Sequence, residues 1–262
     1  LVILTAGIDL SIGSLVKLSV LVSAILMDGN PDNVWMAVIL TLGMGLVVGL
    51  IHAFLINEFN LSPFVVTFAS LFILQGISLT ITTKPIGRAS RDFLMLYSQK
   101  FLGVPIIVYY FIFITLLIMF LLRKTVFGKH IYAIGGNLSV AQLSGIPVKR
   151  VRYGVYGLCS VLAASTGLLW LMRMGVGDPV IGKELELNAI IAVVIGGTSL
   201  FGGRGTVTGV LGGILLLTFT DNLLVVLGVN QFISGLIKGI IFVIAVAFYK
   251  QADRTRGGFS TP

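Results

Sequence analysis

The sequence has few charged residues and a single cysteine, and both shortages restrict what the protein can be. Only 11% of its 262 residues are charged, whereas 56% are hydrophobic. Soluble domains carry about 25% charged residues, so this chain lacks the polar surface that a water-exposed fold needs. Because Cys159 is its one cysteine, the chain cannot form an internal disulfide, and a metal cluster is not expected.

Apolar runs of membrane-spanning length recur along the whole chain. They predict an all-α, polytopic transmembrane helical bundle. The alternating segments of about ten residues that are typical of a transmembrane β-barrel are not found in the sequence. The expected helical segments are the end of a helix at 1–8, then 11–27, 34–56, 61–82, 104–122, 153–172, 187–201, 207–228 and 231–249. The runs 11–27 and 187–201 are short for a bilayer, and short, glycine-interrupted spans are typical of a substrate pathway.

The distribution of basic residues predicts how these helices are oriented. The loop 123–152 contains six Lys and Arg and no acidic residue, so the positive-inside rule places it in the cytoplasm. Counting spans from this loop also puts the tail 250–262 in the cytoplasm, and it puts 28–33, 83–103 and 173–186 outside. The loop 83–103 is basic as well, and it either faces an acidic partner or is a solvated surface. This topology explains the net charge of +8, and we expect no nucleic-acid partner.

The stretch "LTAGIDLSIGS" (4–14) interrupts the first apolar region with one acidic and several small residues. We interpret it as a glycine-permitted break before a helix, with Asp9, Ser11 or both accepting hydrogen bonds from the free amides of the first turn. In lipid, those amides would otherwise cost several kcal/mol each. Two interpretations stay open: a structural cap only, or a break that lines a substrate path, since ionisable residues are costly at membrane depth.

Other polar residues also interrupt apolar runs. Lys17 follows Asp9 by eight residues, about 12 Å along a helix, which is too far for a direct ion pair. Lys17 therefore either snorkels, pairs with a residue of another helix or marks a pore. Lys238 poses the same question in the last span. Asp221 and Asn222 are expected to form an interhelical hydrogen bond, with a role in the pathway as the alternative.

Glycines recur at an interval that favours close helix contact. They are four residues apart in three sets, which are Gly45/Gly49, Gly205/Gly209/Gly213 and Gly235/Gly239. Small residues at this spacing predict helix–helix packing. The segment "IGGTSLFGGRGT" (195–206) is richer still in glycine, and it is either a tight cytoplasmic turn or a re-entrant bend.

Catalytic and nucleotide-binding motifs are not found in the sequence. Its only histidines are His52 and His130, and no Ser/His/Asp or metal-ligand cluster stands out. The nearest match to a phosphate-binding loop is "GDPVIGKE" (177–184), which has Glu184 where Ser or Thr would bind magnesium. We therefore expect no enzymatic activity in this chain.

The basic loop contains a helix of its own. Its length far exceeds that of an ordinary connection, about 4–6 residues. The central "NLSVAQLSGI" (137–146) has an Asn cap, small and apolar residues at helical spacing, and a glycine stop, which predicts a short amphipathic helix. Such a helix docks in a groove on another protein or, alternatively, lies on the membrane surface.

Three stretches together resemble a known family. "GIDLSIGS", "YAIGGNLSVAQLSGI" and "ELNAIIAVVIGGTSLFGGRGTVTG" resemble motifs of the permeases of ribose/xylose-type ABC sugar importers, a group that includes galactoside and autoinducer-2 permeases. The resemblance covers residues 1 to about 250, which gives a transmembrane domain at 1–249 and a tail at 250–262. It implies about ten helices, of which eight or nine are expected here. The abrupt start at "LVILTAG" agrees with a missing N-terminal part.

The resemblance also implies partners and site residues. Permeases of this family work in pairs, as homo- or heterodimers, in the bilayer of the bacterial cytoplasmic membrane. They act with a sugar-binding protein outside and an ABC ATPase inside, and the ATPase binds ATP and magnesium, so this chain needs no cofactor. The residues implied to couple to the ATPase are Gly135, Gly136, Asn137, Ala141, Leu143, Ser144, Gly145 and Ile146. The candidates for lining the translocation path are Asp9, Ser11, Ser14, Gly196, Gly197, Thr198 and Ser199, together with Asp221 and Asn222.

The sequence departs from this family at two charged positions, and other functions stay open. Family members commonly carry a small or apolar residue at the position of Lys17 and Asn at the position of Asp221. One alternative function is an ion- or proton-coupled secondary transporter, in which Asp9, Lys17 and Asp221 form a relay. The other is a permease for branched-chain amino acids from a related ABC class.

Overall fold

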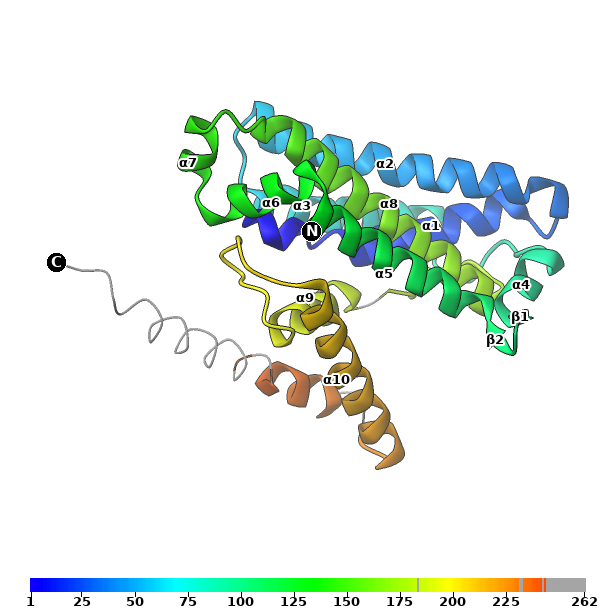
Figure 1. Cartoon of the computed structure of the whole chain (residues 1–262). Helices are drawn as coiled ribbons and strands as arrows, with labels where there is room; N and C mark the ends of the chain where they lie inside the picture. The colour runs from blue at the N-terminus through cyan, green and yellow to red at the C-terminus, as the bar shows by residue number, and fades with distance from the viewer. Residues whose placement is uncertain (183, 231–232, 242, 244–262) are drawn as a thin grey trace.

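Helices make up nearly all regular structure of the chain, as the computed structural model shows (Figure 1). Residues 1–182, 184–230, 233–241 and 243 are described. In chain order the elements are η1 (Val2–Thr5), α1 (Ile12–Met27), η2 (Pro31–Asn33), α2 (Val34–Glu58), α3 (Pro63–Ile81), α4 (Arg91–Ser98), β1 (Lys100–Phe101), β2 (Val104–Pro105), α5 (Ile106–Lys124), α6 (Val126–Gly136), α7 (Leu138–Leu143), α8 (Val148–Met174), α9 (Leu185–Ile195) and α10 (Val207–Val226). The strands β1 and β2 form one small antiparallel hairpin. The predicted all-α bundle is confirmed.

Five helices within the described ranges are long and apolar enough to cross a membrane. They are α2 together with η2, α3, α5, α8 and α10. They match the predicted spans closely, except that α8 begins at Val148, five residues before the predicted start at 153. The apolar helices α1 and α9 are shorter, with 16 and 11 residues, so the two spans predicted to be short are indeed short.

Two predicted helical segments differ in extent from the structure. Residues 1–8 contain only the single 3-10 turn η1, which ends because Ala6 is left-handed, with φ of 59°. The predicted helix 187–201 ends at Ile195, and Gly197 then adopts φ of 79°, a conformation that glycine accepts without strain. Of the last predicted span, 233–241 are helical. The rest of 231–249, apart from 243, and the whole tail 250–262 lie outside the described residues.

The centre of the bundle is formed by α1, α2 and α8, and glycines set the contact between α2 and α8. A Cβ atom on Gly45 would lie 2.6 Å from Ala164 Cβ, and one on Gly49 would lie 2.8 Å from Gly157 Cα. Both distances are too short for real atoms, so the two backbones approach as only glycine allows. The predicted packing role of this pair is confirmed.

A second glycine contact joins α9 to α10. A Cβ atom on Gly196 would lie 2.5 Å from the Gly209 carbonyl oxygen, and one on Gly213 would collide with the carbonyl of Ala192. The predicted packing role of Gly209 and Gly213 is therefore confirmed as well. By contrast, a Cβ atom on Gly235 or Gly239 would meet no described atom within 4 Å.

The two ends of the bundle gather different loops. At the end with α4, β1 and β2 (Figure 1), Gly29 N–H donates to the Arg88 carbonyl, Ala89 N–H donates to Gly175, and Ile86 bridges to Gly177. The loops 28–33 and 83–103 and residues 173–177 thus meet at one end of the bundle. The helix α7 lies at the opposite end (Figure 1).

The outer surface of the bundle is apolar. Phenylalanines on α5 (Phe111, Phe113 and Phe120) and Ile39 on α2 are exposed. A surface of this kind is unfavourable in water but matches the hydrocarbon of a bilayer. The chain therefore has the exterior of a multi-pass membrane protein.

Candidate functional site

The predicted loop helix is present as α7, with both of its end signals. The Asn137 side chain accepts a hydrogen bond from Val140 N–H at 3.0 Å, which caps the first turn. At the other end Gly145 has φ of 76°, and Ile146 N–H donates to the Ala141 carbonyl at 3.1 Å. A left-handed glycine with this back-directed bond is a common helix stop. The local prediction for 137–146 is therefore confirmed.

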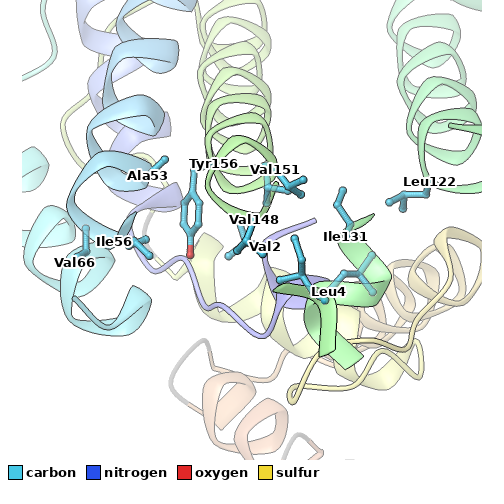
Figure 2. Packing of buried hydrophobic residues seen from close by; sticks show 13 residues of the cluster. Val2, Leu4, Ala53, Ile56, Val66, Leu122, Ile131, Val148, Val151 and Tyr156 are labelled. Carbon is cyan, nitrogen blue, oxygen red and sulfur yellow. The ribbon is translucent and has the colours of Figure 1, made fainter. Parts of the chain in front are cut away.

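One side of α7 is anchored and the other is exposed. Ala141 is buried in a cluster with Val2, Leu4 and Ile131, which joins η1, α6 and α8 (Figure 2). Leu143 is 89% exposed, and Val140 and Ser144 are exposed beside it. A leucine this exposed at the tip of a fixed element is an apolar contact point for another molecule.

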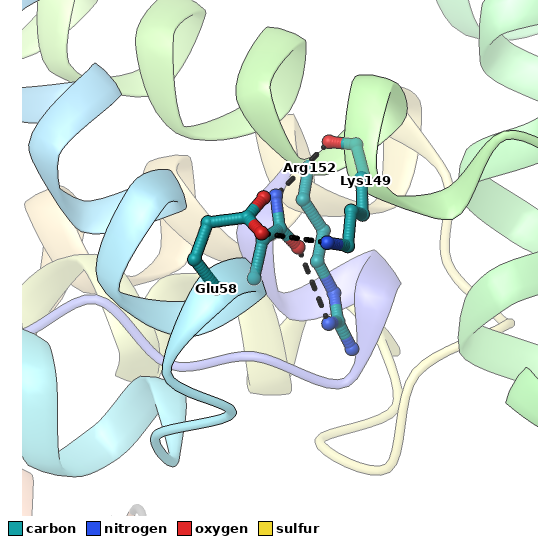
Figure 3. Close-up of polar contacts among 4 residues, drawn as sticks. Glu58, Lys149 and Arg152 are labelled. Carbon is teal, nitrogen blue, oxygen red and sulfur yellow. Dashed lines mark hydrogen bonds and ion pairs between the residues drawn. The ribbon is translucent and has the colours of Figure 1, made fainter.

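Polar contacts fix the N-terminal end of α8, just beyond α7. Lys149 Nζ pairs with Glu58 Oε2 at 2.7 Å, and Asn57 donates to the Lys149 carbonyl at 3.1 Å (Figure 3). Arg152 donates to Asn57 Oδ1 at 3.5 Å. Because Lys149 and Glu58 are both largely solvent-exposed, their pair contributes about 0–1 kcal/mol. Its main effect is to tie the end of α2 to the start of α8.

Three chain segments meet behind α7 in what we call the glycine junction, formed by Leu4–Ala6, Gly135–Gly136 and Gly202–Gly203. Gly203 N–H donates to the Leu4 carbonyl at 3.0 Å. A Cβ atom on Gly135 would collide with the Leu4 carbonyl and the Gly203 nitrogen. Each segment belongs to, or directly adjoins, one of the three stretches that carry the family resemblance, so motifs far apart in sequence form one contact.

A tyrosine adds a polar bond beside this junction. Tyr132 on α6 donates its hydroxyl hydrogen to the Gly205 carbonyl at 2.8 Å. Burial raises the pKa of the Tyr132 phenol above its usual value, against a smaller opposing effect of the Arg123 charge. The hydroxyl therefore stays protonated and remains a donor at physiological pH.

The glycine-rich stretch 196–205 forms a tight turn at the same end. Ser199 N–H donates to the Arg204 carbonyl at 2.9 Å, and Gly202 N–H donates back to Ser199 at 3.1 Å. Thr198 and Ser199 are buried. These amides find partners within the segment and at the glycine junction, as both the tight turn and the re-entrant bend require.

Asp9 satisfies one amide of the break before α1. Its Oδ1 accepts hydrogen bonds from Ser11 N–H at 2.9 Å and from the Ser11 hydroxyl at 2.6 Å. Ser11 occupies the N-cap position, but its side chain forms no capping bond, so the prediction of Ser11 as a side-chain cap is wrong. The Ser11 hydroxyl instead donates its hydrogen bond to Asp9. Asp9 is 4% exposed, and its Oδ2 has no hydrogen-bond partner within the described part of the chain.

Ser14 and Lys17, one turn further along α1, line a cavity of about 300 Å³. Gln75 and Leu79 of α3, residues of the segment before α9 including Glu184, and Glu186 in the first turn of α9 complete the wall. Lys17 is 9% exposed and interacts electrostatically with Glu186, and the Glu186 carboxylate lies directly against Gly13. The nearby Glu186 favours a partner on another helix over snorkelling, and the position of Lys17 on the cavity wall leaves the pore alternative open.

The candidates on α10 lie apart from this cavity. Asp221 pairs with Lys238 at 2.8 Å, so the prediction of an interhelical polar contact holds for Asp221, with a charged partner. Asn222 is exposed. Asp9, Lys17 and Asp221 thus interact with three different neighbours, and the structure does not assemble them into the relay that a coupled secondary transporter would need.

Sequence reasoning missed the cavity residues Gln75 and Glu186. The usable signal for Glu186 was an acidic residue at the border of a short apolar span, the position where a counter-charge for Lys17 is expected. Gln75 lay inside the span 61–82 as its one amide side chain. Neither signal says which helix faces which, and only the fold supplies that.

The fold and these features define a polytopic membrane protein with a helix displayed on one end of its bundle, and comparisons with known proteins agree. The family of branched-chain amino acid transport system permease components matches residues 1–246. The ribose import permease of Bacillus subtilis is 40% identical over 248 residues, covering 94% of this chain and 77% of that protein. The ribose import permease of Escherichia coli K12 is 36% identical over 251 residues, with coverages of 94% and 78%.

Two further relatives extend the comparison. A probable ABC transporter permease of Sinorhizobium fredii is 38% identical over 261 residues, covering 98% of this chain and 77% of that protein. The D-allose transport system permease of Escherichia coli K12 is 35% identical over 246 residues, with coverages of 94% and 76%. No solved structure matches. The chain belongs to this family of ABC transporter permeases and is a multi-pass inner-membrane protein.

Proposed function

We propose that the chain is the membrane-spanning subunit of an ATP-driven importer of a monosaccharide. Relatives that are at least 35% identical over nearly the whole chain are named as ribose and allose permeases, and this supports a five- or six-carbon sugar as substrate. ATP and magnesium bind to a separate ATPase subunit, and this chain catalyses no reaction. A second permease subunit, identical or homologous, packs against the apolar exterior of the bundle.

The observation that carries the proposal is α7, a capped helix held rigidly at one end of the bundle with Leu143 exposed at its tip. The segment Gly135–Ile146 docks in a groove on the ATPase, as short amphipathic helices do. This end, with the basic loop 123–152, faces the cytoplasm. The opposite end, where 28–33, 83–103 and 173–177 meet, receives the sugar-loaded binding protein.

Closure of the ATPase dimer then moves α7, and the bundle changes between outward- and inward-open states. The glycine junction supports this step, because Gly135 contacts both the opening segment at Leu4 and the turn at Gly203 without intervening side chains. A shift of α6 therefore displaces both segments as rigid bodies. The path-lining groups on or next to these segments are Asp9, Ser11, Ser14, Gly196, Gly197, Thr198 and Ser199. The two other candidates for the path, Asp221 and Asn222, lie further along the chain on α10.

A matched pair of substitutions tests the coupling. Gly145→Val introduces a β-branched residue at φ of 76°, a conformation that costs such a residue about 1–2 kcal/mol, whereas Gly145→Asn retains a residue that tolerates it. In the complex with the ATPase and the binding protein, Gly145→Val and deletion of 137–146 should abolish sugar-stimulated ATP hydrolysis. Gly145→Asn should retain it, and all variants should insert into the membrane. Unchanged hydrolysis in the deletion variant would refute the coupling role.

The family description names branched-chain amino acids, so the substrate class needs its own comparison. Vesicles that contain the assembled complex should take up ribose or allose, and this uptake should require ATP. If the vesicles took up leucine instead, the assignment of a sugar substrate would be wrong, and the assignment to the ABC transporters would remain.

A further inference from the structure

The cavity beside Lys17 has an unusual lining for a membrane-embedded bundle. Ser14, Lys17, Gln75 and Glu186 all face it. Among the residues that the structure describes, Ser14, Lys17 and Gln75 form no hydrogen bond of their own, and they line the cavity. Ionisable groups at membrane depth mark functional positions. The polar groups of these three residues are therefore available to a ligand or to water in the cavity.

The depth of the cavity agrees with a place on a transport route. Lys17 lies ten residues before Met27, the end of α1, which is about 15 Å along the helix. Met27 is next to the loop 28–33 at the end of the bundle that carries α4 and the β-hairpin. About 15 Å is half the thickness of a hydrocarbon core of about 30 Å, so Lys17 lies near the middle of the bilayer.

The chemistry of the lining suits a ligand with many hydroxyl groups. The cavity wall carries the Lys17 ammonium together with the carboxylates of Glu184 and Glu186, the Gln75 amide and the Ser14 hydroxyl. This mixture of donors and acceptors suits hydroxyls, which can both donate and accept. A volume of about 300 Å³ is at the lower limit for ligand pockets, about 300–1,000 Å³, and it fits one small ring.

We infer that this cavity, between α1, α3, residues 179–182 and the start of α9, is a transient sugar-binding site inside the permease, with Gln75, Ser14, Lys17 and Glu186 as its recognising groups. The inference rests on the proposed function and deepens it. It assigns substrate discrimination partly to the permease itself, in addition to the external binding protein.

Thiol labelling in the assembled complex tests the site independently of transport. In a Cys159→Ala background, Leu79→Cys should react with a small water-soluble thiol reagent, because Leu79 lines the cavity but supplies none of its polar groups. D-ribose should slow the reaction, and adding Ser14→Ala should weaken this protection roughly two- to tenfold, the effect of one hydrogen bond. Ile73→Cys is the matched control, since Ile73 is 59% exposed on the other side of α3, and ribose should not protect it.

Each outcome separates the site from the importer assignment. Protection of Leu79→Cys by ribose but not by leucine supports the site, even if uptake does not depend on ATP, a result that would remove only the importer assignment. ATP-driven ribose uptake by a Leu79→Cys complex that ribose does not protect would overturn the site and leave the importer in place. Protection by leucine alone would overturn the choice of a sugar as the ligand. Lys17→Met, checked for folding by gel filtration, should abolish ribose protection.

Discussion

At the scale of single residues, two charged side chains have counter-charges that are distant in sequence. Lys17 lies near Glu186, and the partly exposed Asp221 pairs with Lys238. A lone charge in such a setting is strongly unfavourable, whereas a matched pair, or its complete apolar replacement, is tolerated. This asymmetry makes the Lys17–Glu186 pair testable by combining substitutions.

We expect Lys17→Met alone to destabilise the folded protein by about 1–3 kcal/mol, because it leaves the Glu186 carboxylate without its counter-charge. The double variant Lys17→Met/Glu186→Gln should recover part of this loss. Thermal unfolding in detergent, followed by the fraction of monodisperse protein, measures both. A double variant as unstable as the sum of the two single variants would show that the charges do not interact.

At the scale of elements, helix positions were predictable and helix partners were not. The spans α2, α3, α5, α8 and α10 follow from local hydropathy, and α7 from its Asn cap and glycine stop, since these signals lie within the element itself. The ends at Ala6 and Ile195 were missed because a glycine or a left-handed residue stops a helix only when the surrounding fold needs a turn there. The cavity was missed because its walls come from α1, α3, the segment before α9 and the first turn of α9.

The packing of α2 on α8 gives a test with an internal control. Gly43→Ala and Gly49→Ala are the same change on one helix, but a Cβ atom on Gly43 meets nothing within 4 Å, whereas one on Gly49 meets the backbone of Tyr156 and Gly157. Gly49→Ala should therefore destabilise the protein by about 1–3 kcal/mol, as measured by its melting temperature in detergent. Gly43→Ala should leave that temperature unchanged or raise it slightly. Equal effects would contradict the close approach.

The glycine junction offers an adjacent pair in the same way. A Cβ atom on Gly135 would collide with Leu4 and Gly203, whereas one on Gly136 has free space. If the junction transmits the movement of α7, Gly135→Ala should lower the sugar taken up per ATP hydrolysed, and Gly136→Ala should not. If the ratio of sugar taken up to ATP hydrolysed, measured in vesicles, were the same in both variants and in the unchanged protein, the glycine junction would have no role in coupling.

At the scale of the whole molecule, the bundle presents different surfaces at its two ends, and its orientation can be tested. Ser144 is exposed beside α7, and Gln99 is exposed beside β1 at the opposite end. In a Cys159→Ala background, Ser144→Cys should react with an impermeant thiol reagent only in inside-out vesicles, and Gln99→Cys only in right-side-out vesicles. The reverse pattern would invert the topology and place α7 away from any cytoplasmic ATPase.

The central claim, that the chain is the permease of an ATP-driven sugar importer, is tested most directly by purifying the full-length protein from native membranes and assaying whatever co-purifies for ATPase activity. The account predicts that an ATPase co-purifies and that its rate rises when a ribose-loaded binding protein is added. A chain that purifies alone, in vesicles whose uptake follows an ion gradient without ATP, would contradict it.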